Sequence, residues 1–337
     1  MRALLFVPLV LVSALPVPAE APELYREVTS VNWVVKDLDQ VARGWAKLGY
    51  PVLQDFGEIA LPVRYRGEAR TAVVRVAQAD FAGLDVFWFQ PVSGESSWSD
   101  FLEEHGEGVM SINHSVPSRE ALDAEVGRLE GLGVAVLQTM DVDTGQGMLR
   151  VVQMDTGERG KYVLGLTTGT VPPPSTSAPP SPFGARLSQY ALVVRDLPAV
   201  SDYWQKLGLP AMDVTHPALT DLRYHGRPGE FDQKLGWHRH GTVTWEWILP
   251  LKGPTVYQDF LDAHGEGVHH LGFDMADIDA AADAWTRLGY PIAQSGSWGE
   301  KGRPGSGRFA YADTTSIGGV TIELLWNHPG ESQASRP

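Results

Sequence analysis

The sequence has no cysteine among its 337 residues. That absence excludes disulfide bonds, thiolate metal sites, iron–sulfur clusters and a cysteine nucleophile. Basic residues are also few, with 27 Lys and Arg against 41 Asp and Glu, which gives a formal net charge of −14. A surface this acidic repels phosphate backbones, and the chain has no local basic stripe, so we expect no nucleic-acid partner.

Long hydrophobic runs are confined to the N-terminus. Arg2 is followed by an uncharged stretch over residues 3–15 and by the small residue Ala19, the pattern of a secretory signal peptide, which we predict over residues 1–19. The run is shorter than the roughly 20 apolar residues that cross a bilayer. An uncleaved anchor or a buried first helix are the alternatives. The prediction is a periplasmic or secreted protein with no stable membrane insertion after signal removal.

The chain contains a tandem repeat. Residues 100–109 and 259–268 are nearly identical and lie 159 positions apart, and the same offset relates Trp45 to Trp204. A proline-rich stretch that cannot build a core separates the two copies. The predicted organisation is a first domain at 24–168, a Pro/Ser/Thr-rich linker at 169–186, a second domain at 187–328 and a disordered tail at 329–337.

Each copy is itself a pair of similar halves. In the second copy a shift of 81 relates Asp196 to Asp277 and Trp204 to Trp285. Each half begins with an apolar strand, continues with a helix that starts at an Asp, and ends with about three further strands. The strands that matter below are expected at 189–194, 242–249, 269–275 and 319–326.

A paired strand–helix–three-strand unit resembles the vicinal oxygen chelate superfamily, which includes glyoxalase I, methylmalonyl-CoA epimerase, extradiol dioxygenases and bleomycin-resistance proteins. The segment HisGlyGluGlyValHisHisLeuGlyPhe at 264–273 is most similar to the epimerase branch. The resemblance covers Val28 to His328, once per copy. It implies an α+β fold of two tandem glyoxalase-like domains, each a pair of βαβββ units that form a cupped sheet with outer helices.

The resemblance also implies a metal site in the second copy. Its four ligand positions, carried over residue by residue, are Gln189, Glu246, His270 and Glu323. This is the ligand set of eukaryotic-type glyoxalase I, whereas epimerases more often have His at the first position. Glyoxalase I has an Arg four residues after that Gln, where this chain has Val193, so glutathione is not implied as a substrate. Coenzyme A esters are equally unexpected for an exported protein.

The first copy has no such ligands. The same offset of 159 leads to Ser30, Phe87, Ser111 and Leu164, none of which is a strong ligand for a divalent ion. The resemblance therefore implies a first domain that keeps the fold without a metal.

Strand alternation gives independent support for the four residues. Glu246, His270 and Glu323 each lie on the strand face opposite the bulky apolar side chains, whereas His269 falls on the apolar face and is expected in the core. A carboxylate inside a sheet costs several kcal/mol unless it is paired or bound to a cation. The alternatives are glutamates on a solvated outer face and a hydrogen-bonded core histidine.

Two other features were considered as sites. His238 and His240 share a strand face and form a rival metal-binding pair, although the adjoining residues favour a hairpin. The glycine-rich segment 299–308 lacks the ending of a phosphate-binding loop and is expected to be a lid over the cup.

Three oxygen donors and one imidazole suit one divalent ion such as zinc, nickel, cobalt or manganese. The expected function is redox-neutral proton transfer next to a carbonyl of a small molecule, a lyase or isomerase reaction, with Glu323 as the base by resemblance to glyoxalase I and Glu246 second. The alternatives are a binding or resistance protein without catalysis and an extradiol-type dioxygenase. The expected assembly is a monomeric pseudo-dimer or a homodimer.

Overall fold

The protein is described from a computed structural model, which covers residues 22–239, 241 and 243–328. The predicted signal peptide, the predicted tail and His240 lie outside the described residues. No helix within the described ranges is long and apolar enough to cross a membrane.

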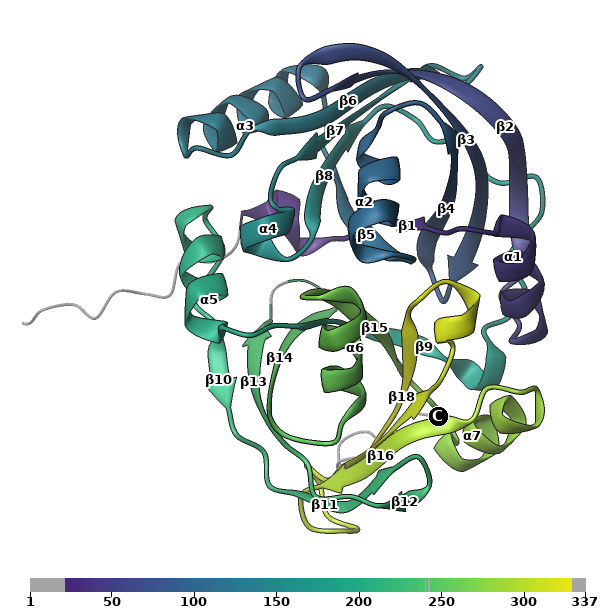
Figure 1. The fold of residues 1–337 in the computed structure, drawn as a ribbon, viewed down its shortest axis with the longest axis vertical. Coiled ribbons are helices and arrows are strands. Elements are labelled where there is room, and N and C mark those ends of the chain that lie inside the picture. Colours follow the sequence, from purple (N-terminus) through teal and green to yellow (C-terminus); the bar gives the residue numbers. More distant parts are fainter. Residues whose placement is uncertain (1–21, 240, 242, 329–337) are drawn as a thin grey trace, which may run out of the picture.

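The first copy builds two strand–helix–three-strand units joined by a helix (Figure 1). Its elements are η1 (Glu23–Arg26), β1 (Ser30–Val34), α1 (Leu38–Lys47), β2 (Val52–Tyr65), β3 (Glu68–Phe81), β4 (Leu84–Ser93), α2 (Ser97–His105), β5 (Gly108–Ser115), α3 (Arg119–Gly131), β6 (Val136–Asp143), β7 (Met148–Met154), α4 (Gly157–Gly160) and β8 (Val163–Thr168).

The second copy repeats this order with two strands divided. Its elements are η2 (Pro182–Gly184), β9 (Arg186–Val193), α5 (Leu197–Lys206), β10 (Asp213–Thr215), β11 (Leu219–Tyr224), β12 (Arg227–Pro228), β13 (Asp232–His238), β14 (Thr244–Lys252), α6 (Val256–His264), β15 (Gly267–Asp274), α7 (Ile278–Arg287), β16 (Ile292–Trp298), β17 (Gly307–Ala312), η3 (Thr315–Ile317) and β18 (Thr321–Asn327). The expected α+β fold of two glyoxalase-like units is confirmed.

The two sheets curl to different extents. In the first copy the strands close into a barrel in the order β1-β4-β3-β2-β6-β7-β8-β5. In the second copy the ten-stranded sheet stays open, in the order β10-β13-β14-β9-β15-β18-β17-β16-β11-β12. The long strand β2 pairs with both β3 and β6, whereas its counterpart is divided at His216–Ala218 into β10 and β11. Pro217 lies in that break and has no N–H to donate to a ladder.

The helices that follow the first strand of each unit begin at a capping side chain. Asp37, Asp196 and Asp277 each accept a hydrogen bond from the backbone N–H three residues later, and Ser118 does the same. These caps end the preceding loop at a fixed point and so orient each helix against the outer face of the sheet.

The apolar interior has three parts. One large cluster runs through both copies and includes Trp33 and Trp45 of the first and Trp204 and Trp285 of the second. A second cluster fills the first barrel, and a third lies inside the cup of the second copy. Helix α6 contributes Tyr257 to this third cluster, and therefore covers the inside of the cup.

Candidate metal centre

Two of the predicted residues lie in one row across the second sheet. Glu246 on β14 pairs with Ala191 on β9, and Ala191 pairs in turn with His270 on β15. Residues paired in this way project from the same face. The small side chain of Ala191 leaves the space between the acid and the imidazole open.

The other two lie in the neighbouring row. Gln189 on β9 pairs with Gly272 on β15, which pairs with Glu323 on β18. A Cβ atom added to Gly272 would lie 2.9 Å from Oε1 of Gln189 and 3.0 Å from Oε2 of Glu323. The glycine therefore allows the amide and the carboxylate to approach each other over the bare backbone.

The structure brings three of the predicted side chains into direct proximity. Nε2 of His270 lies 3.2 Å from Oε2 of Glu323 and 3.6 Å from Oε2 of Glu246. One donor atom from each of the three lies within 4.8 Å of the others. All three are buried, with 6%, 0% and 4% exposure for Glu246, His270 and Glu323. Gln189 is half-buried and reaches the group across Gly272.

Two oxygen atoms in this group have no hydrogen-bond partner. They are Oε1 of Gln189 and Oε2 of Glu246, and both are buried. A buried oxygen without a partner costs about 1–3 kcal/mol, and more when it is charged. The cluster is therefore an unfavourable arrangement for these residues alone.

Burial and the neighbouring charges shift the pKa values of the site. Burial raises the pKa of Glu246, and the neighbouring charge of Glu323 raises it further. For His270, burial alone would lower the pKa, but Glu323 and Glu246 together raise it to about 9. The site therefore favours a positive charge between its carboxylates.

His269 is buried, as expected, but it does not lie on the strand face of Leu271 to which strict alternation assigns it. The pairing of β9 with β15 shifts between Val268 and His270, which leaves His269 in a β-bulge. The bulge turns the ring inward, and its Nδ1 lies 2.8 Å from Nδ1 of His270. Its ring also meets Tyr257 and Tyr311 edge-on.

Two tyrosines that the sequence did not point to form part of the wall of the candidate metal centre. The hydroxyl groups of Tyr257 on α6 and Tyr311 on β17 lie 2.6 Å apart, and Tyr311 pairs with Glu323. Burial raises the pKa of both hydroxyls, as does the charge of the two glutamates, so both keep their protons.

The rival histidine His238 is buried against Trp247, with ring centroids 6.0 Å apart.

In the first copy, an asparagine occupies the corresponding space. Asn113 takes the place of Gly272, and its amide donates to Oγ of Ser30 and Oδ1 of Asn32. Oγ of Ser111 lies 3.2 Å from its Oδ1. A neutral hydrogen-bonded cluster thus replaces the ionisable one.

The structure corrects one first-copy position. Asn113 pairs with Gly165, as Gly272 pairs with Glu323, so the counterpart of Glu323 is Gly165 and not Leu164. Leu164 is buried in the shared apolar cluster. The offset falls from 159 to 158 before β8, because the first copy is one residue longer relative to the second ahead of that strand. A Cβ added to Gly165 would lie 1.8 Å from Oδ1 of Asn113, so the asparagine requires this glycine.

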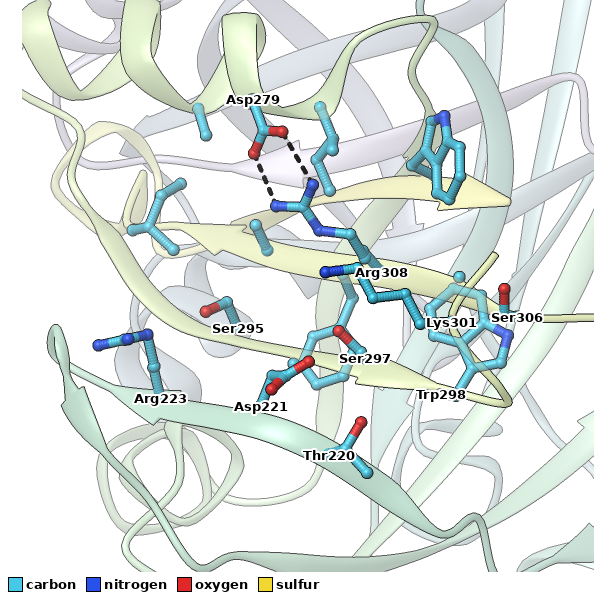
Figure 2. Close-up of a pocket in the computed structure, with 18 of the residues that line it drawn as sticks. Thr220, Asp221, Arg223, Asp279, Ser295, Ser297, Trp298, Lys301, Ser306 and Arg308 are labelled. Atoms are coloured by element: carbon cyan, nitrogen blue, oxygen red, sulfur yellow. Dashed lines mark hydrogen bonds and ion pairs between the residues drawn. The ribbon is translucent and has the colours of Figure 1, made fainter. Parts of the chain in front are cut away.

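A large hollow of the second copy lies elsewhere. It measures about 1080 Å³ and lies between β11, β16 and α7. Figure 2 shows Arg308 in this hollow with its guanidinium directed at Asp279, and the two form hydrogen bonds of 2.6 and 2.8 Å. The loop predicted as a lid borders this hollow through Lys301 and Ser306. The four candidate ligands are not among its lining residues.

The chemistry of the four residues fits a divalent cation. Two carboxylates, an imidazole and an amide oxygen converge, and the unpartnered oxygens of Gln189 and Glu246 are donors without another role. Zinc, nickel, cobalt and manganese accept such a mixed set of oxygen and nitrogen ligands. A cation would also remove the repulsion between the two buried glutamates.

Comparisons with known proteins agree with this fold. Residues 188–311 match the family described as the Glyoxalase/Bleomycin resistance protein/Dioxygenase superfamily, a span that contains Gln189, Glu246 and His270. The second copy thus carries the match to this superfamily, and the chain as a whole has its tandem fold. The recognition of the vicinal oxygen chelate superfamily from the sequence is confirmed. No curated protein matches the chain in sequence.

Solved structures share the layout of both copies. A triple mutant of 4-hydroxymandelate synthase from Streptomyces coelicolor is 15% identical, with a TM-score of 0.58 over 93% of this chain and 94% of that one. A xylose isomerase-like TIM barrel/4-hydroxyphenylpyruvate dioxygenase fusion protein is 14% identical, with a TM-score of 0.55 over 93% of this chain and 51% of that one. The Mn(II)-bound glyoxalase from Novosphingobium aromaticivorans is 17% identical, with a TM-score of 0.49 over 90% of this chain and 83% of that one.

Proposed function

We propose that the second copy binds one divalent cation through Gln189, Glu246, His270 and Glu323 and catalyses proton transfer next to a carbonyl of a small molecule. The observation that carries the proposal is the convergence of three buried ionisable side chains from three strands on one point. A divalent cation bound there supplies Lewis acidity, which polarises an oxygen of the substrate.

The carboxylates perform the proton transfer in this proposal. Glu323 is the proposed base, and Glu246, whose Oε2 has no hydrogen-bond partner, is the second candidate. Their burial keeps water away, which strengthens their interaction with a developing charge. The hydroxyls of Tyr257 and Tyr311, which keep their protons, line the same wall of the site.

The donor set supports redox-neutral chemistry over oxygen chemistry. Non-haem iron oxygenases typically hold their metal with two imidazoles and one carboxylate, whereas here one imidazole stands among three oxygen donors. The similar solved structures include dioxygenases, but their identity of 15% or less makes them guides to the fold alone.

The test is a pair of substitutions measured for both metal content and turnover. Glu323→Gln keeps an amide oxygen as a ligand and removes the base, so we expect turnover to fall by about 10²–10⁴-fold while one cation per chain remains. Glu246→Gln is measured in parallel, and Glu58→Gln, an exposed carboxylate, serves as the matched control. The substrate screen uses 2-oxoaldehydes and hydroxy-ketones.

Two outcomes would replace the proposal. A purified protein that binds none of the zinc, nickel, cobalt or manganese offered, yet binds small molecules, would be a binding protein. Iron-dependent oxygen consumption with a catechol would identify a ring-cleaving dioxygenase.

We further propose that the chain is exported, that its mature form has two domains at 24–168 and 187–328, and that it works as a monomeric pseudo-dimer. Mass spectrometry of the protein isolated from its natural source tests the first point, because removal of residues 1–19 would leave a new N-terminus at Glu20. Light scattering tests the last. A full-length N-terminus or a stable homodimer would contradict these proposals.

A further inference from the structure

The two adjacent histidines of β15 form an unusual nitrogen-to-nitrogen contact. Nδ1 of His269 lies 2.8 Å from Nδ1 of His270, and both rings are buried. Two nitrogens at this distance share one proton, so one ring donates and the other accepts. The remaining contacts of the pair decide which ring does which.

The groups that face His270 settle the direction. Its Nε2 lies 3.2 Å from Oε2 of Glu323 and 3.6 Å from Oε2 of Glu246, so this nitrogen is on the side of the proposed cation. A neutral imidazole binds a cation through its unprotonated nitrogen and carries its proton on the other one. Nδ1 of His270 is therefore the donor of the short contact, and Nδ1 of His269 is the acceptor.

This contact also orders the two nitrogens of His270. Its Nδ1 carries the proton that His269 accepts, which leaves Nε2 as the nitrogen that faces Glu246 and Glu323. We infer that His269 is a positioning residue that fixes the tautomer and ring orientation of His270, so that Nε2 is the atom presented to a cation. This inference rests on the cation site proposed above.

The first copy provides an internal comparison. It has the same bulge, since the pairing of β1 with β5 shifts at the corresponding place and leaves Met110 between Val109 and Ser111. Met110 also lies in the apolar cluster inside its barrel. The bulge thus belongs to the fold, whereas the nitrogen acceptor on it occurs in the copy that has the ionisable cluster.

Two substitutions distinguish the hydrogen-bond acceptor of His269 from the packing of its ring. His269→Phe keeps a ring against Tyr257 and Phe260, whose centroids lie 5.3 and 5.2 Å away, but has no acceptor. His269→Asn places an oxygen near the position of Nδ1. We expect zinc affinity, measured by calorimetry in the full chain, to fall by about 10–100-fold in the Phe variant and to recover largely in the Asn variant.

A spectroscopic measurement tests the tautomer itself. Nitrogen-15 NMR of the wild-type protein is expected to show a slowly exchanging proton on Nδ1 of His270, with and without zinc, and the Phe variant is expected to lose this protection. An unprotonated Nδ1 in His270, or a folded Phe variant with wild-type zinc affinity, would overturn the inference.

The two proposals fail separately in this design. If the wild-type protein binds no zinc, nickel, cobalt or manganese, the cation site is refuted, while the zinc-free spectrum still decides whether His269 accepts from His270. If the Phe variant does not fold, as judged by circular dichroism, the Asn variant and the wild-type spectrum carry the test.

Discussion

His105 and His264 form a reciprocal pair between the two copies. Nδ1 of His105 lies 3.1 Å from the main-chain oxygen of His264, and Nδ1 of His264 lies 2.7 Å from the main-chain oxygen of His105. Each residue ends its helix, α2 or α6, and the two are 159 positions apart. This is the self-complementary contact expected at a two-fold axis, here formed within a single chain.

The same reciprocity extends to the helices beside the interface. Nε1 of Trp45 on α1 donates to the carbonyl of Ile317 in the second copy, at 2.9 Å. Nε1 of Trp204 on α5 donates to the carbonyl of Gly160 in the first copy, at 3.1 Å. Each copy therefore covers one helix of the other, so the copy without the ionisable cluster contributes to the packing of the copy that has it.

The fit of α1 against η3 predicts an asymmetry between two helical glycines. A Cβ added to Gly44 on α1 would lie 2.3 Å from Cγ2 of Ile317, whereas one added to Gly127 on α3 would meet nothing within 4 Å. Alanine favours a helix interior by about 1 kcal/mol over glycine. We expect Gly127→Ala to stabilise the protein and Gly44→Ala to destabilise it, as measured by urea unfolding.

The two substitutions are chemically identical, so helix propensity cancels in their comparison. If Gly44→Ala stabilised the chain as much as Gly127→Ala, the close approach of α1 to the loop at Ile317 would be wrong.

A second prediction separates a hydrogen bond from ring packing. Trp204 and Trp98 are both buried and stacked, on Tyr162 and Phe89 respectively, but Nε1 of Trp98 has no partner. Replacement of Trp204 by Phe leaves the carbonyl of Gly160 unpaired, which costs about 1–3 kcal/mol. We therefore expect Trp204→Phe to lower the free energy of unfolding more than Trp98→Phe does. Equal losses would show that the interface bond contributes nothing.

Much of the candidate site could be predicted from the sequence because strand alternation is local. Glu246 and Glu323 each interrupt an apolar face, so their common orientation follows from a period of two. The resemblance to the vicinal oxygen chelate superfamily then placed their strands at equivalent points of a duplicated unit. The structure does bring both acids to His270.

The features that were not predicted depend on structural irregularities, which the alternation of side chains along a strand does not encode. The β-bulge at His269 turned a predicted core side chain inward, and a change of one residue in the offset made Gly165 the counterpart of Glu323. Asn113, which fills the first site, was also missed, because its role depends on the absence of a side chain on another strand. The break at Pro217 that opens the second sheet was likewise not predicted.

A third prediction concerns stability in the presence of a cation. The folded site gathers two buried carboxylates, so a cation that binds there stabilises the native state by mass action, by about 2.7 kcal/mol at a hundredfold excess over Kd. We expect zinc to raise the thermal unfolding temperature and a chelator to reverse the rise. The double variant Glu246→Gln, Glu323→Gln is expected to show no rise, and an equal rise in that variant would locate the cation elsewhere.

The last prediction introduces the asparagine of the first copy at the equivalent position of the second copy. Gly272→Asn would place a carboxamide between Gln189 and Glu323, where Asn113 lies in the first copy. In the first copy Asn113 needs Gly165 opposite it, and the counterpart of Gly165 is Glu323, so the variant folds only if the side chain of Glu323 moves aside. Since its amide would fill the space over the bare backbone, zinc binding is expected to be lost.

Gly272→Ala is the graded control for this prediction. Its Cβ would lie 2.9 Å from Oε1 of Gln189 and 3.0 Å from Oε2 of Glu323, so these side chains must move apart, and we expect weaker binding without complete loss. Calorimetry with zinc and circular dichroism measure affinity and fold on the same samples. A folded Asn variant with wild-type zinc affinity would mean that the cation does not lie between these strands, because the new side chain would fill the space between Gln189 and Glu323.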